Sequence, residues 1–338
     1  MERVAPKPKM LETRKRLDHY FPHELTKRIT PVDTLFTTST LGIPDVSIED
    51  WALEITGLIE NSKSFSYSEL LALPKRTLET VHVCSGNPKK PTTPLRRASN
   101  VRWSGVDLAE LLKELGVDKS ATHIWSYGLD FGEEEGDDFG AIAHYVKDMP
   151  LSRLEDGDIL VAYELNDEPL NNKNGFPARL VIPGYYGTNS TKWLCRLEVT
   201  DRRPDSYHTT VVYNDPDYDA DPSGKITKPV WHLAPECLFA SHKKKCEIPN
   251  KDTELWGWAW SNCSAEYVDV SVDGGKTWHG AELETPNGRT WQQFSFNWTP
   301  DEPGEHDVRC RTRDVNGNIQ PEDNARNLIQ SITITVSD

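Results

Sequence analysis

The last third of the chain carries the feature that most restricts its fold, a series of short segments in which apolar and polar residues alternate. The clearest of them are 256–260, 267–273, 291–298 and 304–314, and Gly, Asn and Asp residues separate them. Alternation with a period of two predicts strands that bury one face. Several such strands, about 10–12 residues apart, predict a β-sandwich.

The preceding part of the chain mixes strand and helix patterns. Residues 51–59 alternate as a half-buried strand does, and residues 106–116 place apolar side chains at helical spacing before a terminal glycine. Residues 158–166, 179–183 and 192–199 have the pattern of further strands. We therefore predict an α+β fold, with a mixed α/β domain before the β-sandwich.

Length and pattern together predict how the chain divides. At 338 residues it is long for one core, since domains average about 150 residues. Residues 1–30 are basic, contain proline and show no periodicity, so we expect an N-terminal arm. We place the mixed domain at 31–235 and the β-sandwich domain at 236–338.

Charge, cysteine content and hydropathy exclude several classes of partner and site. The formal net charge of −15 argues against nucleic acid or an anionic membrane as partner, and leaves a cationic partner open. The six cysteines form no CxxC pair, so we expect neither a structural zinc site nor a disulfide scaffold. No window approaches the ~18 apolar residues of a membrane span. We expect a soluble, cytoplasmic protein; a mature form stripped of its leader would have the same features.

Cys84 is the first candidate functional residue. It follows a β-type run and precedes Ser85, Gly86 and Asn87, so a turn would present its thiol at the end of a strand. Such a thiolate can bind a metal or a cofactor. In isolation, a cysteine in this position is more often a small core residue.

A second candidate site lies near residues 174–193. Gly184 and Gly187 let backbone amides approach an anion, while Ser190 and Thr191 offer hydroxyl groups and Lys192 adds charge. These features suit a phosphate, and they also suit a hairpin turn with a surface lysine. The chain contains no GxGxxG, no Walker-type loop, no GxSxG and no HExxH.

Together these residues resemble the sulfite oxidase family of molybdopterin-dependent oxidoreductases. The resemblance rests on an ordered set of segments: 29–36, the strand before Cys84, 103–112, 175–187, the Lys192–Trp193 pair, 257–261 and 270–278. It implies a molybdopterin-binding domain followed by an immunoglobulin-like domain that makes a homodimer, with molybdenum-molybdopterin as cofactor and no heme domain.

The resemblance also implies roles for individual residues. Cys84 matches the thiolate that ligates molybdenum, and Tyr213 lies close to a family tyrosine beside the metal, at a different spacing. With Cys84 and Tyr213, we take Lys89 as the third catalytic candidate. The positions that the resemblance assigns to cofactor binding are Phe36, Thr38, Thr40, Cys84, Asp130, Asn174, Arg179, Ser190, Thr191 and Lys192.

The chain also departs from the family pattern where positive charge is expected. Thr38 stands at the substrate-facing arginine, Thr40 and Asn174 stand at histidines, and Pro88–Lys89 replace two arginines. The second-domain arginine has no counterpart in 261–267. Sulfite is a dianion that needs fixed cations. Arg96, Arg97 and Arg102 offer charge from another direction, although we expect the first two at the surface.

The favoured function is therefore molybdenum-dependent oxygen-atom transfer to sulfite or another small substrate. Electrons would pass to an external acceptor, a basic c-type cytochrome or oxygen. One alternative is a cofactor-binding or assembly protein that retains the scaffold with little turnover. Others are a relative that acts on a non-sulfite substrate, because the anion-binding arginines are missing, and an enzyme that works in the reductive direction, as nitrate-reducing relatives do.

Overall fold

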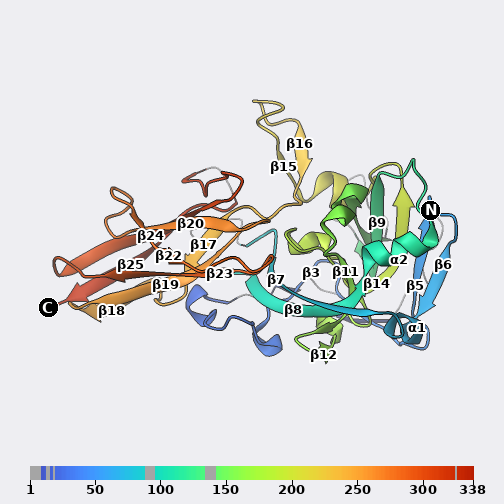
Figure 1. Ribbon diagram of the computed structural model, residues 1–338, viewed down its shortest axis with the longest axis horizontal. Coiled ribbons are helices and arrows are strands. Elements are labelled where there is room, and N and C mark those ends of the chain that lie inside the picture. Colours follow the sequence, from blue (N-terminus) through green and yellow to red (C-terminus); the bar gives the residue numbers. More distant parts are fainter. Residues whose placement is uncertain (1–8, 13–15, 18–19, 88–95, 134–141, 324–325) are drawn as a thin grey trace. The chain divides into compact units, whose positions relative to one another are not determined.

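The computed structural model describes residues 9–12, 16–17, 20–87, 96–133, 142–323 and 326–338. These residues form two compact units (Figure 1). The first unit comprises the described residues of Met1–Asp18, Thr37–Leu78 and Arg102–Trp231, and the second those of His19–Phe36, Glu79–Val101 and His232–Asp338. The chain passes from one unit to the other within strands β7 (Lys75–Val83) and β8 (Ala98–Asp107).

The first unit contains two larger sheets. One has the order β10 (Ile142–Pro150), β9 (His123–Glu133), β14 (Leu194–Thr200), β5 (Ala52–Gly57), β6 (Lys63–Ser66). In it β5 and β14 are parallel, and the other pairs are antiparallel. The other sheet has the order β12 (Glu168–Pro169), β11 (Leu160–Leu165), β8, β7, and β13 (Arg179–Val181) also pairs with β11.

Two α-helices belong to the first unit, and the second lies within the range 106–116 where the sequence predicts a helix. Helix α1 (Tyr67–Leu71) starts with a capping box in which Ser66 and Glu69 bond reciprocally. Helix α2 (Leu108–Leu115) is capped by the Asp107 side chain and ends at Gly116, whose φ of 72° suits glycine. All four leucines of α2 are buried in the core of this unit, as the helical spacing requires.

The remaining elements of the first unit and its connections are short. They are β1 (Lys9–Glu12), β2 (Arg16–Leu17), β3 (Thr38–Ser39), β4 (Ile43–Asp45), η3 (Leu151–Asp156), η4 (Asn172–Asn174), η5 (Gly187–Asn189), the π-helix η6 (Tyr207–Val211), β15 (Asn214–Pro216) and β16 (Thr227–Pro229). Strands β15 and β16 form a hairpin in the stretch 200–235, where the sequence suggests a loop or linker. The pairs β1–β4 and β2–β3 add strand structure to the region expected to be an arm.

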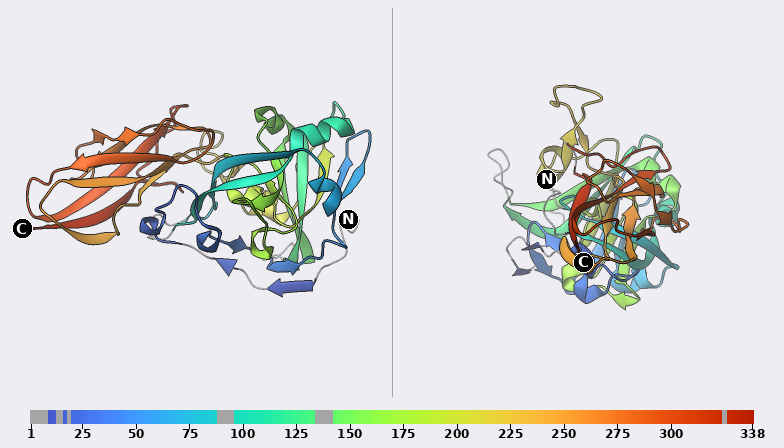
Figure 2. Two further views of the ribbon diagram at one scale, coloured as in Figure 1. Left: turned by 60° about the horizontal axis from the view of Figure 1, so that its bottom comes forward. Right: turned by 90° about the vertical axis from the view of Figure 1, so that its left-hand side faces the viewer.

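The second unit contains the predicted β-sandwich (Figure 2). One sheet has the order β17 (Glu236–Phe239), β19 (Thr253–Trp260), β23 (Gln292–Trp298), β22 (Glu282–Leu283). The other has the order β18 (Lys245–Pro249), β25 (Gln330–Ser337), β24 (Gly304–Asp314), β20 (Ala265–Ser271), β21 (His279–Gly280). Short 3-10 helices η1 (Pro22–Glu24) and η2 (Val32–Thr34) precede them.

The sandwich core follows from the alternation seen in the sequence. Along β24 every second residue from Val308 to Asp314 is buried, and Val268 and Val270 of β20 are fully buried. Phe294 and Ile334 complete the same cluster. The α+β prediction is thus confirmed, while the domain boundaries at 30 and 235 stay a prediction. In the described part of the chain, no helix is long and apolar enough to cross a membrane.

Candidate cofactor site

The loop 172–193 carries most of the predicted phosphate-binding residues, and hydrogen bonds join its two ends. Trp193 adopts a left-handed backbone conformation, with φ of 49°. Its indole Nε1 donates to the Asn172 carbonyl at 2.7 Å, and its backbone N–H donates to the Gly175 carbonyl at 3.3 Å. These bonds join the end of the loop to its beginning, so Arg179 and Lys192, which lie between them in sequence, are held by a fixed backbone.

Arg179 is a buried cation, only 4% exposed. Its Nη1 donates to the Asn174 carbonyl and its Nη2 to the Ser190 carbonyl, both at 3.1 Å. Within the described residues, its Nε has no hydrogen-bond partner and no carboxylate pairs with it. Burial lowers the pKa of Arg179 to about 9. Because buried charges are normally paired, this arrangement fits an anionic ligand.

Asp130 is a buried acceptor on β9. Its carboxylate is 5% exposed, and among the residues described Oδ1 has no hydrogen-bond partner. Burial raises the pKa of Asp130 to about 7, and the charge of Lys192 limits the rise. A Cβ at Gly128 would lie 2.3 Å from Oδ1, so only glycine leaves the carboxylate its place. An N–H-rich ligand would satisfy this oxygen.

The other predicted residues of this loop form hydrogen bonds with nearby groups of the chain. Lys192 Nζ donates to the Thr38 carbonyl at 2.9 Å and lies 4.2 Å from the ring centre of Trp193. The Ser190 hydroxyl accepts from the Ile182 N–H at 3.2 Å, and the hydroxyl groups of Thr191 and Ser126 are 2.7 Å apart. The structure thus bonds Arg179 to Asn174 and Ser190, and Lys192 to Thr38, while Thr40 is half-buried.

Cys84 belongs to the second unit, directly after β7 as predicted. The thiol is half-buried, and Sγ accepts the Gly86 N–H at 3.4 Å and Arg97 Nη1 at 3.8 Å. Two residues earlier, His82 stacks on Phe36 with ring centres 5.5 Å apart. Lys89 lies outside the described residues.

Beside Cys84 lies a buried ion pair that the sequence reading missed. We expected Arg96 at the surface, and this is wrong: Arg96 is 1% exposed, and its Nε lies 3.8 Å from Oε1 of Glu236, which is 3% exposed. Asn87 Nδ2 reaches the same carboxylate at 3.4 Å. Burial raises the pKa of Glu236 to about 7. Adjacent arginines before a strand give no signal of burial, because the partner lies far along the chain.

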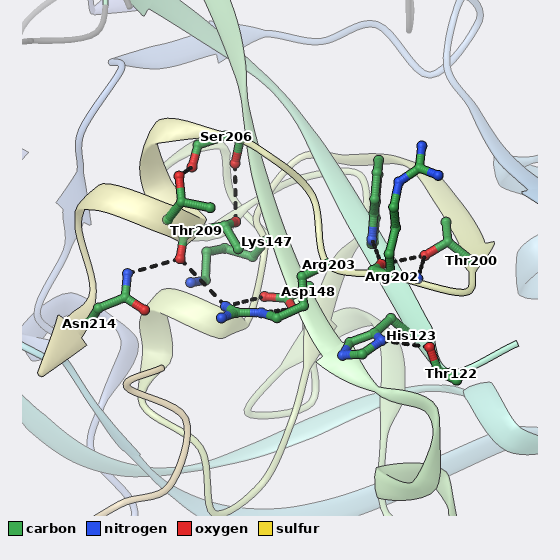
Figure 3. Close-up of polar contacts among 12 residues, drawn as sticks. Thr122, His123, Lys147, Asp148, Thr200, Arg202, Arg203, Ser206, Thr209 and Asn214 are labelled. Carbon is green, nitrogen blue, oxygen red and sulfur yellow. Dashed lines mark hydrogen bonds and ion pairs between the residues drawn. The ribbon is translucent and has the colours of Figure 1, made fainter. Parts of the chain in front are cut away.

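Tyr213 adjoins a second buried polar cluster. Its φ is 56°, and its ring lies 6.3 Å from the His208 ring and 5.5 Å from Lys147 Nζ. Lys147 donates to the His208 carbonyl at 3.0 Å, and its neighbour Asp148 pairs with Arg203 at 2.7 Å (Figure 3). Burial lowers the pKa of Lys147 to about 8 and that of His208 to about 4. No local pattern in the sequence indicates this cluster.

Comparison with known proteins identifies the family. A model described as oxidoreductase molybdopterin binding domain matches residues 40–208, and one described as Mo-co oxidoreductase dimerisation domain matches residues 230–334. The chain belongs to the sulfite oxidase family of molybdopterin oxidoreductases. The resemblance seen in the sequence is thereby confirmed.

Individual relatives agree with this assignment. Sulfite oxidase of Gallus gallus is 30% identical over 321 residues, covering 87% of this chain and 68% of that protein. Mitochondrial sulfite oxidase of Drosophila melanogaster is 29% identical over 325 residues, covering 87% and 55%. The chain thus spans little more than half of the latter. The crystal structure of the sulfane dehydrogenase SoxCD from Paracoccus pantotrophus matches with a TM-score of 0.80, at 24% identity, covering 95% of this chain and 88% of that one, which shows the fold.

Proposed function

We propose that the protein is a molybdenum cofactor-dependent oxidoreductase that oxidises sulfite or another small substrate and passes electrons to an external acceptor. The observation that carries this proposal is that one unit contains both a buried cation and a buried acceptor, each with an atom that lacks a hydrogen-bond partner among the described residues. Arg179 Nε and Asp130 Oδ1 have no partner in the described part of the protein. A pterin with an anionic phosphate would offer an acceptor to Arg179 Nε and a donor to Asp130 Oδ1.

The proposed cofactor roles follow from chemistry and from the family positions. Arg179 and Lys192 would hold the phosphate, Asp130 would accept N–H groups of the pterin, and Cys84 would bind the metal as a thiolate. When bound, the cofactor supplies a two-electron metal centre that exchanges an oxygen atom with the substrate. The protein holds and orients it: the loop closed by Trp193 keeps Arg179 in place, and two hydrogen bonds orient the Cys84 sulfur.

The substrate is proposed to be a small sulfur compound, with sulfite turned over slowly. Thr38 is neutral where the family pattern has a substrate-facing arginine, so the desolvated dianion would be poorly balanced. In the second unit the guanidinium of Arg97 beside Cys84 is one cation that remains. A less charged sulfur compound makes a smaller demand on the site.

Partners of the whole protein are also proposals. The net charge of −15 favours a basic acceptor such as a c-type cytochrome, since opposite charge accelerates encounter. The match of residues 230–334 to a dimerisation domain supports a homodimer through the C-terminal domain. A cytoplasmic location stays a prediction.

Metal and pterin analysis tests this function. Protein purified from a host that makes the cofactor is expected to contain about one molybdenum and one pterin per chain, and sulfite or an uncharged organic sulfide such as dimethyl sulfide is expected to bleach its visible absorption. Metal-free protein, obtained while the host's own molybdenum enzymes are loaded, would contradict the proposal and favour the assembly-protein alternative. Loaded protein that neither compound reduces would contradict the substrate class alone.

A further inference from the structure

Two donors from its own unit lie beside the sulfur of Cys84. The Gly86 N–H lies 3.4 Å from Sγ and Arg97 Nη1 lies 3.8 Å from it. The backbone of Arg97 is held on both sides, because its carbonyl accepts from the Cys84 N–H at 2.9 Å and its N–H donates to Asn87 Oδ1 at 2.5 Å. Arg97 therefore has a fixed starting point beside the thiol.

The Asn87 side chain that holds the Arg97 backbone is itself held by a buried carboxylate. Asn87 Nδ2 lies 3.4 and 3.5 Å from the two carboxylate oxygens of Glu236, which is buried. Arg96 lies within ion-pair distance of that carboxylate. Within the described residues, Arg97 has no carboxylate partner. Its charge is thus left to act on the sulfur.

Gly86 supplies the space that this contact needs. A Cβ at position 86 would lie 3.1 Å from Arg97 Nη1, closer than side chains normally pack. The atom it would meet is the end of a flexible side chain, so a methyl group there would move the guanidinium by a few tenths of an ångström. The turn after Cys84 therefore lets Arg97 approach the sulfur at its present distance because residue 86 has no side chain.

We propose that Arg97 is a positioning residue that raises the redox potential of the metal bound at Cys84 by donating a charged hydrogen bond to its thiolate; this rests on the proposed function. Donors to a metal-bound sulfur withdraw electron density from the metal. They stabilise the reduced state, which carries more negative charge. The contact of Arg97 is to the Cys84 sulfur that would bind the metal, so its effect does not depend on the substrate-facing arginines that the chain lacks.

The test compares holoenzyme variants by redox titration, monitored by electron paramagnetic resonance, and by the thiolate-to-metal absorption band. Arg97→Met removes the donors and keeps the length of the stem, and is expected to lower the midpoint potential. The expected size is about tenfold in the reduced-to-oxidised ratio at a fixed potential, or about 59 mV for one electron. The band is expected to shift as well, and Arg97→Lys to restore part of both changes.

Two further variants make the test specific. Gly86→Ala displaces Arg97 without removing it, so the same changes are expected at smaller size. Arg311→Met is the matched control: Arg311 lies on β24 of the same unit, pairs with Asp269 at 3.1 Å and is 30% exposed, so no change is expected.

Each outcome has a distinct meaning. Arg97→Met protein that carries normal molybdenum but has an unchanged potential and band would overturn this inference and leave the proposed function standing. A raised KM with an unchanged potential would overturn it too, and would make Arg97 a substrate contact. Wild-type protein without molybdenum would overturn both proposals. If Arg97→Met does not fold, Gly86→Ala decides by the same readouts.

Discussion

The guanidinium carbon of Arg179 lies 4.7 Å from the ring centre of Trp103, and both side chains are buried. The cation is held by an indole face and two carbonyl oxygens rather than by a carboxylate. A flat guanidinium can stack and donate in this way, whereas an ammonium group cannot reproduce the geometry.

Arg179→Lys is therefore expected to lose cofactor although it keeps the charge. We expect bound pterin in the purified protein to fall at least about tenfold, the equivalent of about 1.4 kcal/mol. The matched control is Arg153→Lys, since Arg153 is also buried beside a ring but pairs with Asp158 at 2.7 Å. Equal pterin content in both variants would contradict the role of Arg179.

The pH dependence of the cofactor-free protein tests the burial of Asp130. Its pKa of about 7 in the folded state lies above the ordinary 3.8, so the folded state binds more protons between these values. Stability therefore falls as the pH rises from about 4 to 7, by on the order of 4 kcal/mol for this group. Urea unfolding at pH 5 and pH 8 should show a smaller loss for Asp130→Asn. Identical losses in variant and wild type would show that the carboxylate is solvated.

For Lys147, the predicted change of stability with pH has the opposite sign. Its pKa is lowered to about 8 in the folded state, below the ordinary 10.5, so the unfolded state binds more protons between these values. Stability from this group therefore rises as the pH increases from about 8 to 10.5. In unfolding experiments at pH 7.5 and 9.5, Lys147→Met should lack this increase, and the exposed Lys113→Met should keep it. A wild-type slope in Lys147→Met would contradict the burial of this ammonium group.

Restoring a cation at residue 38 tests the substrate proposal. Wild-type sulfite oxidation is expected to be slower than ~10 per second, a typical enzyme turnover. Thr38→Arg should raise kcat/KM for sulfite at least about tenfold, because the dianion gains a fixed donor pair. The Lys192 bond to the Thr38 backbone carbonyl does not depend on this side chain. Thr38→Gln is the neutral control, and an equal gain there would rule out a charge effect.

Local patterns predicted much of the fold. The helical spacing of apolar residues over 106–116 and the glycine at its end predict helix α2, and the alternation along β24 predicts a strand of the sandwich. Cys84 lies at the end of a strand as expected, since the β-type run and the following turn are adjacent in sequence. Each of these features depends on residues close together in the chain.

The missed features depend on residues far apart in the chain. Arg96 is buried because Glu236 supplies a carboxylate 140 positions later. Lys147 and Asp148 are polar residues that give no local signal of burial. They are buried because Arg203 and the π-helix with His208 cover them. Neither partner can be chosen from the sequence alone, because many other charged residues would serve equally well.

X-ray absorption at the molybdenum edge measures directly whether the Cys84 sulfur is a ligand of molybdenum, as we propose. The wild-type protein is expected to show one more sulfur neighbour of the metal than Cys84→Ser protein loaded with the same pterin. Equal sulfur counts in the two loaded proteins would contradict the claim.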